Sequence, residues 1–455
     1  MKIPRILLAA GASGSGKTLI TCGLLQALVN RGLKVASFKC GPDYIDPMFH
    51  SRVIGTRSRN LDTFFTDGDR TRYLLAKNAS ACEIAVMEGV MGYYDGVGGI
   101  TSRASAYDLA STTDTPVILI VNSRGMSVSL PAYVKGFLEY KNDSHIQGVI
   151  FDQMSPMLYP RMKKLLEEEL SVKVLGYVPK VEDCVIESRH LGLYTAGEIR
   201  DLQQRISLLA DLLEQNLDFT RFSSLFCTPE PVTDSISQEV PAITRLAIAS
   251  DQAFCFCYEE TKEALRAAGA ELVPFSPLTD TQLPENIGGL YLPGGYPELY
   301  ANELAKNEPM LYAIREAVEN GMPTVAECGG FLYLGQHLEG SDGISYPMAG
   351  VLPGDGVRKE KLTRFGYAFL TAQSDSLLFS AGEQIPVHEF HYWDSTENGA
   401  AFLAQKPVTG RSWSCGFATP TLYAGFPHLY GAGHPQWVRR FTHAASEYQK
   451  RQGKS

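Results

Sequence analysis

Eight residues near the amino terminus constrain the fold of this chain more than any other feature. Gly11 to Thr18 read GASGSGKT, a full match to the phosphate-binding P-loop pattern. An apolar run precedes them and a helix-like segment follows, which is the strand–loop–helix context that the motif requires. The glycines allow backbone N–H groups to turn inward on phosphates, with the lysine at the β- and γ-phosphates and the threonine on Mg²⁺. We therefore expect a nucleoside triphosphate site that includes Gly14, Ser15, Gly16, Lys17 and Thr18.

The apolar pattern of the chain predicts two α/β domains in tandem. Strand-like runs such as LKVASFKCG and TPVILIVNS alternate with helix-like segments up to residue 225, which is typical of a parallel sheet covered by helices. The segment CTPEPVTDSISQEVPAI is rich in Pro, Ser and acids, and a second alternation begins at TRLAIASD. We predict domains at residues 1–225 and 244–455, joined by a linker at 226–243. The length of 455 residues exceeds what one core usually organises.

Charge and composition exclude several classes of protein. The formal net charge is −9 and the basic residues are scattered, so we expect no nucleic-acid partner. The longest apolar runs are too short to span a bilayer, and a signal-peptide cleavage near the start would destroy the P-loop. We therefore expect a cytoplasmic protein without a membrane partner. The nine cysteines form no CxxC pair, which argues against a zinc site. The oligomeric state stays open, and a homodimer is among the possibilities.

Acidic residues follow two of the predicted strands of the first domain. Glu88 ends the apolar run CEIAVMEGV, and Asp43 and Asp46 lie in KCGPDYIDP after the second strand. The carboxyl ends of parallel strands face the ligand crevice, so these acids are expected to complete a nucleotide–metal site with Thr18. Asp95, in MGYYDG, is equally well explained as a solvated loop acid.

The second domain contains a short apolar strand that runs into a thiol and two glycines, TVAECGG, at residues 324–330. This pattern is typical of a nucleophile elbow, in which a strained turn presents one side chain and small neighbours are needed. Backbone N–H groups at Gly329, and at Gly295 in LPGGYPEL, are expected to form an oxyanion hole. The competing interpretation of Cys328 is a buried structural cysteine. A thiol nucleophile needs a base, and the residues alone leave His428, His434 and His391 in contention.

Distinctive stretches in both halves resemble the cobyrinic acid a,c-diamide synthase family, which comprises glutamine-dependent amidotransferases of corrinoid biosynthesis. They include FKCGPDYIDP, MEGVMGYYDG, ESRHLGL, LYLPGGYPEL, AECGGFLYLG and HEFHY. The N-terminal half also resembles dethiobiotin synthetase, and the C-terminal half resembles the class I glutamine amidotransferases. The resemblance implies an α/β fold with a dethiobiotin-synthetase-like parallel sheet domain followed by a class I glutamine amidotransferase-like domain.

The family resemblance also implies the chemistry. Cys328 would attack the side-chain amide of glutamine and release ammonia. His428, in AGFPHLY, best matches the family histidine by position, and His434 is the runner-up. Class I enzymes carry a glutamate two residues after that histidine; here the residue is Tyr430, so a Cys–His dyad is expected. The synthetase half would transfer the γ-phosphate of ATP to the a and c carboxylates of cobyrinic acid, and ammonia would displace the phosphate.

Site residues of the synthetase half follow from matching positions. MgATP would be held by Lys17, Thr18, Asp43, Asp46 and Glu88. The substrate carboxylate would meet the γ-phosphate near Tyr44 and Asp95. Because the substrate carries many carboxylates, we include the cationic candidates Arg124, Arg189 and His190.

Other assignments of the same motifs remain open. Cobyric acid synthase has a similar architecture, but ESRHLGL and DQAFCFCYEE favour the a,c enzyme. Nickel-sirohydrochlorin or hydrogenobyrinate a,c-diamide synthase are alternatives that differ in the ring metal. A different class is a nucleotide-switch binding protein with an inactive glutaminase-like domain, against which the intact Cys328 motif argues.

Overall fold

The computed structural model describes residues 3–180, 188–189, 192–193, 201–226 and 241–452. The chain divides into two compact units, Met1–Ser235 and Ile236–Ser455. The dividing point falls inside the segment predicted as a linker, most of which, residues 227–240, lies outside the described residues. Each unit is built around its own parallel sheet, as the alternating apolar pattern predicts.

The first unit contains a seven-stranded sheet in which every neighbouring pair is parallel. Its central strands are almost wholly buried, which explains why they read as continuous apolar runs rather than alternating ones. In spatial order they are β3 (Arg57–Leu61), β2 (Val35–Cys40), β4 (Ile84–Glu88), β1 (Arg5–Ala10), β5 (Val117–Asn122), β6 (Ile146–Asp152) and β7 (Lys173–Val178).

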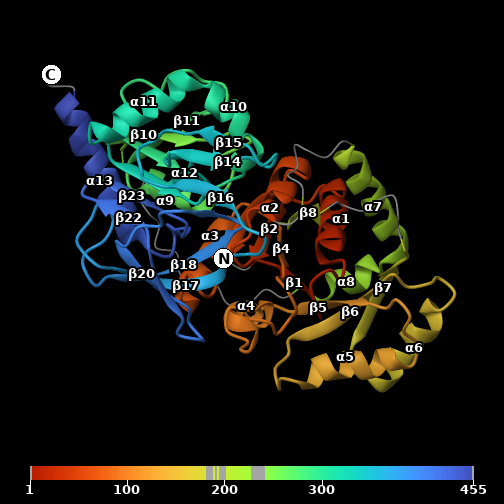
Figure 1. Ribbon diagram of the computed structural model, residues 1–455. Helices are drawn as coiled ribbons and strands as arrows, with labels where there is room; N and C mark the ends of the chain where they lie inside the picture. The colour runs from red at the N-terminus through yellow and green to blue at the C-terminus, as the bar shows by residue number, and fades with distance from the viewer. Residues whose placement is uncertain (1–2, 181–187, 190–191, 194–200, 227–240, 453–455) are drawn as a thin grey trace. The chain divides into compact units, whose positions relative to one another are not determined.

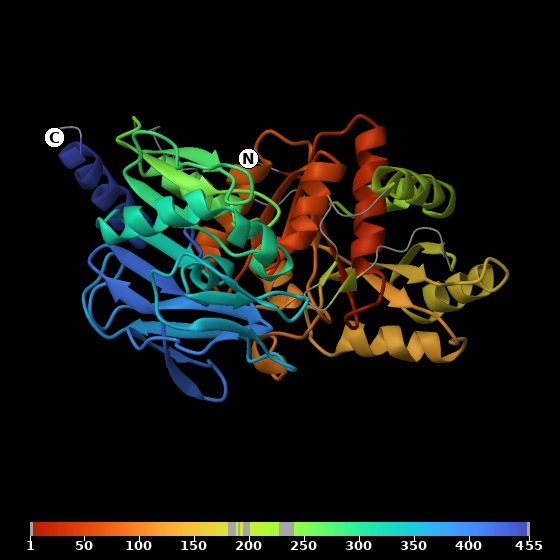
Figure 2. The same cartoon turned by 45° about the horizontal axis from the view of Figure 1, so that its top comes forward.

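Helices cover both faces of this sheet (Figure 1). Helix α1 packs against α7 on one face, and α5 packs against α6 on the other (Figures 1 and 2). The helices are α1 (Lys17–Asn30), α2 (Ile45–Met48), α3 (Gly68–Ala79), α4 (Ala106–Thr113), α5 (Ser129–Glu139), α6 (Tyr159–Glu169), α7 (Leu202–Asn216) and α8 (Phe219–Ser223), with short helical turns η1 (Phe49–Val53) and η2 (Val97–Gly99). A two-stranded ribbon joins β8 (Ser188–Arg189) to β9 (Gly192–Leu193).

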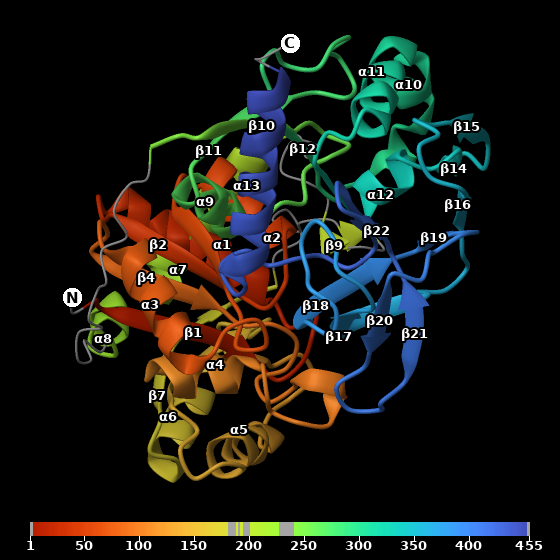
Figure 3. The same ribbon diagram turned by 90° about the vertical axis from the view of Figure 1, so that its left-hand side faces the viewer.

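The second unit contains a six-stranded sheet that is parallel except for its last pair. Its strands in spatial order are β11 (Ala270–Phe275), β10 (Thr244–Ala249), β12 (Gly289–Leu292), β13 (Thr324–Glu327), β23 (Leu422–Gly425) and β22 (Phe417–Thr419). Its helices are α9 (Glu259–Ala267), α10 (Ala301–Lys306), α11 (Glu308–Glu319), α12 (Gly329–Tyr333) and α13 (Pro435–Gln452), with a short turn η3 (Pro297–Leu299). The C-terminal helix α13 lies along β10 (Figure 3) and buries Trp437 completely.

Two small sheets interrupt the second unit between β13 and β23, and the sequence pattern did not predict them. One is a mixed sheet of β15 (Ser345–Pro347), β14 (His337–Glu339), β16 (Asp355–Arg358) and β19 (Trp393–Ser395). The other is antiparallel, with β18 (Gln384–His391), β17 (Arg364–Ala372), β20 (Phe402–Gln405) and β21 (Ser412–Cys415). The backbone N–H of His428 bonds the carbonyl of His388 in β18, so the insertion touches the loop that carries a candidate base.

Within the described residues, every helix is too short or too polar to cross a bilayer.

Candidate functional site

The P-loop connects β1 to α1, and it holds Lys17 at the start of the helix. Gly16 adopts a left-handed conformation (φ 79°) directly before the first helical turn. The Lys17 ammonium donates to the carbonyls of Ala12 at 3.0 Å and Met91 at 2.5 Å. Burial and then the neighbouring Lys39 lower the pKa of Lys17 to about 8. A cation held in this way is stabilised when an anion arrives, and phosphate is the anion that such a loop accepts.

A buried charge cluster lies beside the P-loop threonine. The Thr18 hydroxyl donates to Glu88 at 2.6 Å and lies 3.4 Å from Asp46 Oδ2. Lys39, on β2, pairs with both carboxylates, at 2.9 Å from Glu88. His50 Nε2 contacts the other Glu88 oxygen at 3.2 Å. The cluster is fully or almost fully buried apart from Thr18, so its charges compensate one another.

The charged groups of this cluster shift one another's pKa values. Burial opposes ionisation of Glu88, but Lys39 and His50 outweigh it and hold the pKa of that carboxyl below its usual range. Burial, together with Asp43 and Glu88, raises the pKa of Asp46. Burial also opposes the charge on Lys39, whose pKa is nevertheless raised by Asp46 and Glu88.

The donor set of this cluster fits a magnesium ion. Thr18 supplies a hydroxyl oxygen, and Asp46 and Glu88 supply carboxylate oxygens, which are the hard ligands that Mg²⁺ prefers. Asp43, also predicted here, instead accepts backbone N–H bonds from Ile45 at 2.8 Å and Asp46 at 3.2 Å. Its carboxylate therefore shapes the turn that carries Asp46.

The predicted substrate residues have different surroundings. Tyr44 precedes α2 and is half-buried beside the charge cluster's Asp46, whereas Asp95 is exposed in the loop after β4 and accepts from the N–H of Gly92 at 3.0 Å. Arg124 is exposed after β5. Arg189 lies in β8, where only the backbone is described, and His190 lies outside the described residues.

Cys328 occupies a sharp turn between β13 and α12. Its backbone angles are φ 49° and ψ −102°, a region that side chains rarely adopt. Such strain persists only where the surroundings hold it, and it is the conformation expected of a nucleophile elbow. The thiol therefore lies at the carboxyl edge of the sheet, where ligands bind in open α/β folds.

Small neighbours are required around this turn because the backbones approach closely. A Cβ on Gly330 would lie 2.1 Å from the carbonyl oxygen of Leu292, and one on Gly329 would lie 3.1 Å from the amide nitrogen of Gly295. A Cβ on Gly294 would lie 2.5 Å from Cε1 of His428. The two predicted oxyanion-hole residues, Gly295 and Gly329, are thus brought together beside Cys328.

A buried histidine and a buried carboxylate complete the thiol site. The side chains of His428 and Cys328 are hydrogen-bonded, and His428 Nδ1 lies 3.4 Å from Glu327 Oε2. Burial alone would lower the pKa of His428, but the bond to Cys328 and the charge of Glu327 raise it to about 10. The other Glu327 oxygen accepts from Tyr291 at 3.1 Å and from the N–H of Leu429 at 3.3 Å. This arrangement can hold an imidazolium beside a thiolate.

The competing histidines have different surroundings. His391 bonds the carbonyl of Trp393 at 2.6 Å, contacts Glu389 at 3.3 Å, and stacks on Phe426 at 3.8 Å. His434 lies in the turn before α13. The geometry therefore selects His428 as the partner of Cys328.

Two protein families match the two halves of the chain. Residues 6–193 match the CobQ/CobB/MinD/ParA nucleotide binding domain, and residues 245–422 match the CobB/CobQ-like glutamine amidotransferase domain. Cobyrinate a,c-diamide synthase of Caldanaerobacter subterraneus subsp. tengcongensis is 37% identical over 98% of this chain and 99% of its own length. The enzyme of that name from Thermoplasma volcanium is 37% identical over 99% of both chains. The one from Priestia megaterium is 35% identical over 96% of both.

The chain belongs to the cobyrinate a,c-diamide synthase family. The resemblance read from the sequence is therefore confirmed, as is the order of a nucleotide-binding domain followed by a glutamine amidotransferase domain.

Two residues that the structure places in these sites, Glu327 and Lys39, were not predicted from the sequence. Glu327 stands directly before Cys328, whereas the position where class I enzymes carry the glutamate is Tyr430, whose ring packs on Tyr258. Lys39 was overlooked as an interior residue of an apolar strand. A charged residue inside a buried strand is itself a signal, because burial requires a partner. The expected dyad thus becomes a Cys–His–Glu arrangement in space.

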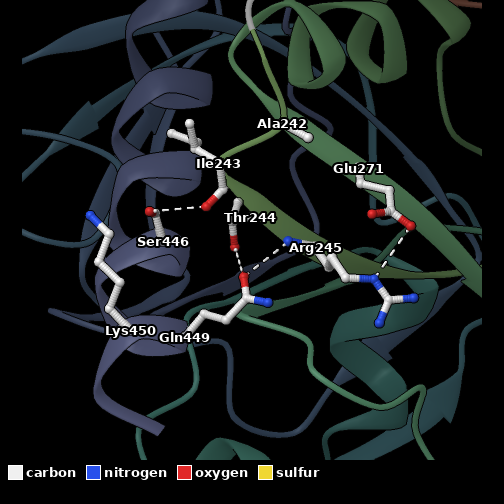
Figure 4. Close-up of a pocket in the computed structure, with 8 residues that line it drawn as sticks. All are labelled: Ala242, Ile243, Thr244, Arg245, Glu271, Ser446, Gln449 and Lys450. Carbon is white, nitrogen blue, oxygen red and sulfur yellow. Dashed lines mark hydrogen bonds and ion pairs between the residues drawn. The ribbon is translucent and has the colours of Figure 1, made fainter. Parts of the chain in front are cut away.

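A groove at the opposite end of the six-stranded sheet differs from the thiol site (Figure 4). It encloses about 280 Å³ near the first residues of β10, and its polar side chains bond one another. Gln449 of α13 accepts from Thr244 at 2.9 Å and from the N–H of Arg245 at 3.2 Å, and Arg245 pairs with Glu271 at 3.3 Å. These bonds hold α13 against the first residues of β10, so the polar side chains of the groove have a structural role.

Proposed function

We propose that this protein is an ATP- and glutamine-dependent ligase that amidates the a and c side-chain carboxylates of cobyrinic acid. The observation that carries the proposal is the presence, in one chain, of an intact phosphate loop and a strained thiol hydrogen-bonded to a buried histidine. Relatives named cobyrinate a,c-diamide synthase align with both halves of the chain, which supports the choice of substrate.

The glutaminase step uses Cys328, His428 and Glu327. His428 takes the thiol proton, and the thiolate attacks the side-chain amide carbon of glutamine. The N–H groups of Gly295 and Gly329 face the developing oxyanion. His428 then returns the proton to the leaving nitrogen, which departs as ammonia and leaves a thioester. Water hydrolyses the thioester to glutamate and restores the thiol.

Glu327 acts in this scheme by orienting the base. Its Oε2 lies beside Nδ1 of His428, which leaves Nε2 for the thiol. Its Oε1 is fixed by Tyr291 and by the N–H of Leu429. A carboxylate held in this way stabilises the imidazolium that forms, as the third member of a catalytic triad does.

The synthetase step uses the phosphate loop. Lys17 neutralises the β- and γ-phosphates of ATP, and the loop N–H groups hold them in place. Thr18, Asp46 and Glu88 would hold Mg²⁺, with Asp43 supporting Asp46; the bound ion supplies charge neutralisation between the phosphates. A substrate carboxylate oxygen attacks the γ-phosphorus, ADP leaves, and the carboxylate becomes an acyl phosphate. Ammonia then attacks the acyl carbon, and phosphate leaves. We place Tyr44 and Asp95 near the reacting carboxylate, with Arg124, Arg189 and His190 as candidates for binding the other carboxylates.

Mass spectrometry of cobyrinic acid incubated with protein and MgATP tests the proposal. Wild type and Cys328→Ala are each supplied with glutamine or with isotope-labelled ammonium chloride. Wild type should form a diamide from either nitrogen source, and Cys328→Ala only from ammonium. An unchanged cobyrinic acid in every reaction would remove the substrate assignment, and nickel-sirohydrochlorin and hydrogenobyrinic acid would then be tested. ATP hydrolysis without any amide product would instead favour a nucleotide-switch protein.

A further inference from the structure

A large cavity adjoins the P-loop within the first unit. It has a volume of about 840 Å³, which lies inside the range of roughly 300–1,000 Å³ that is common for small-molecule sites. Its walls come from the first P-loop residue, from the loop after β4, and from one face of α5. Of the residues predicted to bind substrate, the cavity wall includes Asp95.

The cavity lies at the γ-phosphate end of the loop. Lys17, which neutralises the terminal phosphates, points back toward Ala12 and Met91. Gly11 precedes Ala12 and lines the cavity, and the segment after Met91 forms the opposite wall. The phosphoryl acceptor must approach from this end, so the cavity is placed for the acceptor rather than for the nucleotide base.

Aromatic side chains form one wall of the cavity. Tyr94 stacks on Phe137 at 5.8 Å and 17°, and contacts Tyr140 edge-on at 4.9 Å. Tyr133 packs on Phe137 at 5.1 Å, and its hydroxyl lies 1.8 Å from where a Cβ on Gly11 would be. The phenol of Tyr94 is fixed by a bond to the carbonyl of Phe137 at 2.7 Å. A rigid wall of this kind suits a flat, conjugated ligand.

The mouth of the cavity combines exposed apolar groups with a cation. Ile100 is 75% exposed and Tyr140 is 68% exposed. The ammonium of Lys141 lies 5.4 Å from the ring centre of Tyr140. Hydroxyl groups of Thr101 and Ser102 line the other side. A ligand with an apolar centre and anionic edges matches this distribution.

We propose that this cavity binds the conjugated macrocycle of the tetrapyrrole polycarboxylate, with one carboxylate near Asp95 and the P-loop and another at Lys141. This inference rests on the proposed function, and it deepens it by assigning the ring to the wall formed by Tyr94, Tyr133, Phe137 and Tyr140. Among the predicted substrate residues whose side chains the structure describes, Asp95 lines the cavity, whereas Tyr44 and Arg124 do not.

A substitution that fills the cavity without disturbing the helix provides the test. A Cβ on Gly136 of α5 meets no atom within 4 Å, and leucine favours a helix over glycine, so Gly136→Leu should fold and occupy the cavity. Lys135→Leu, on an exposed neighbour that does not line the cavity, is the matched control. Lys141→Gln removes the cation. Binding of cobyrinic acid is followed by its visible absorbance in equilibrium dialysis, and binding of a fluorescent ATP analogue is measured in parallel.

We expect Gly136→Leu to weaken cobyrinic acid binding about tenfold or more, Lys141→Gln to weaken it severalfold, and neither to change nucleotide affinity. Lys135→Leu should match wild type. Wild-type affinity in Gly136→Leu would overturn the assignment even if wild type amidates cobyrinic acid. An altered oligomeric state of that variant in sedimentation, with unchanged affinity, would assign the cavity to a second copy of the chain. Tight binding without amidation by wild type would contradict the proposed function but keep the site.

Discussion

The two sites of this chain lie at the carboxyl edges of two parallel sheets, but they are built in opposite ways. The phosphate site collects charges: Lys17 and Lys39 are buried with Asp46 and Glu88 beside them. The thiol site is held by sterics, with a strained Cys328 among glycines that admit no side chain. A site for a permanent anion can be prepared by fixed cations. A site that must create its own ion pair needs the base and the nucleophile to meet at one point.

The pKa values of two cationic groups at these sites shift in opposite directions. Lys17 is buried next to another lysine, so its charge is costly until a phosphate arrives. His428 is buried next to a thiol and a carboxylate, so its charge is favoured despite burial. Lys17 is therefore prepared to bind an anion, and His428 is prepared for proton transfer.

Lys17→Met is expected to have the largest effect, and it should affect one site without the other. Loss of the phosphate-loop cation should reduce amidation with glutamine and with ammonium alike, by about a thousandfold or more. Glutaminase activity assayed alone should survive, because Cys328 and His428 lie in the other unit. Diamide formation and glutamate release are measured by chromatography. Equal loss of both activities would show that the two sites do not work independently.

Glu327→Gln should have the next largest effect. It keeps the shape but removes the charge beside His428, and by analogy with catalytic triads the glutamine-dependent rate should fall about 10²–10⁴-fold. Because the carboxylate contributes to the raised pKa of His428, the pH–rate profile should shift as well.

Ammonium-dependent amidation in Glu327→Gln should be unchanged, and Glu319→Gln, an exposed acid at the end of α11, serves as the control. A variant that keeps the wild-type pH profile and glutamine-dependent rate would reduce Glu327 to a structural role.

Gly294→Ala tests the steric half of the comparison. The new methyl would lie 2.5 Å from His428 Cε1 and 3.5 Å from the Cβ of Cys328, so the imidazole must move from its place beside the thiol. Glutamine-dependent amidation should fall about 10–100-fold, since small displacements of reacting groups are costly. Iodoacetamide labelling of Cys328, followed by peptide mass analysis, should slow in parallel. Normal glutaminase activity in a folded variant would contradict the crowding argument.

The smallest expected effect is on stability, and it has opposite signs at the two sites. The folded pKa of Lys17, about 8, is below its ordinary value of 10.5, so the group destabilises the fold below pH 8 and this cost disappears as pH rises to 10.5. The folded pKa of His428, about 10, is above its ordinary 6.5, so its stabilisation is complete below pH 6.5 and is lost as pH rises through 10.

Denaturant unfolding at pH 6.5 and pH 9.5 measures both effects. Lys17→Met should be more stable than wild type by on the order of 1–2 kcal/mol at the lower pH, and less so at the higher one. His428→Gln should be less stable than wild type at pH 6.5, and most of this difference in stability should disappear at pH 9.5. If the stability of both variants relative to wild type changed in the same direction with pH, the surroundings assigned to Lys17 and His428 would be wrong.

Much of the fold was readable from the sequence because buried parallel strands leave continuous apolar runs. The strands around Leu7, Ile118 and Ile150 were recognised in this way, as was the helix after the P-loop. The two small sheets of the second unit were not recognised. Most of their strands have only three or four residues, as β15 and β16 do, which is too short to show a clear period of two, although β17 and β18 have nine and eight residues.

Sequence by itself determined the parts of each site that are contiguous: the GASGSGKT loop and the strand–Cys–Gly–Gly turn. Their chemistry depends on backbone geometry, which neighbouring residues dictate. Only the tertiary structure decided which distant groups join them. It brought His428 from about a hundred residues away to Cys328, turned Glu327 toward that histidine, and placed Lys39 between Asp46 and Glu88. Such pairs are set by strand order and by burial, which no local pattern encodes.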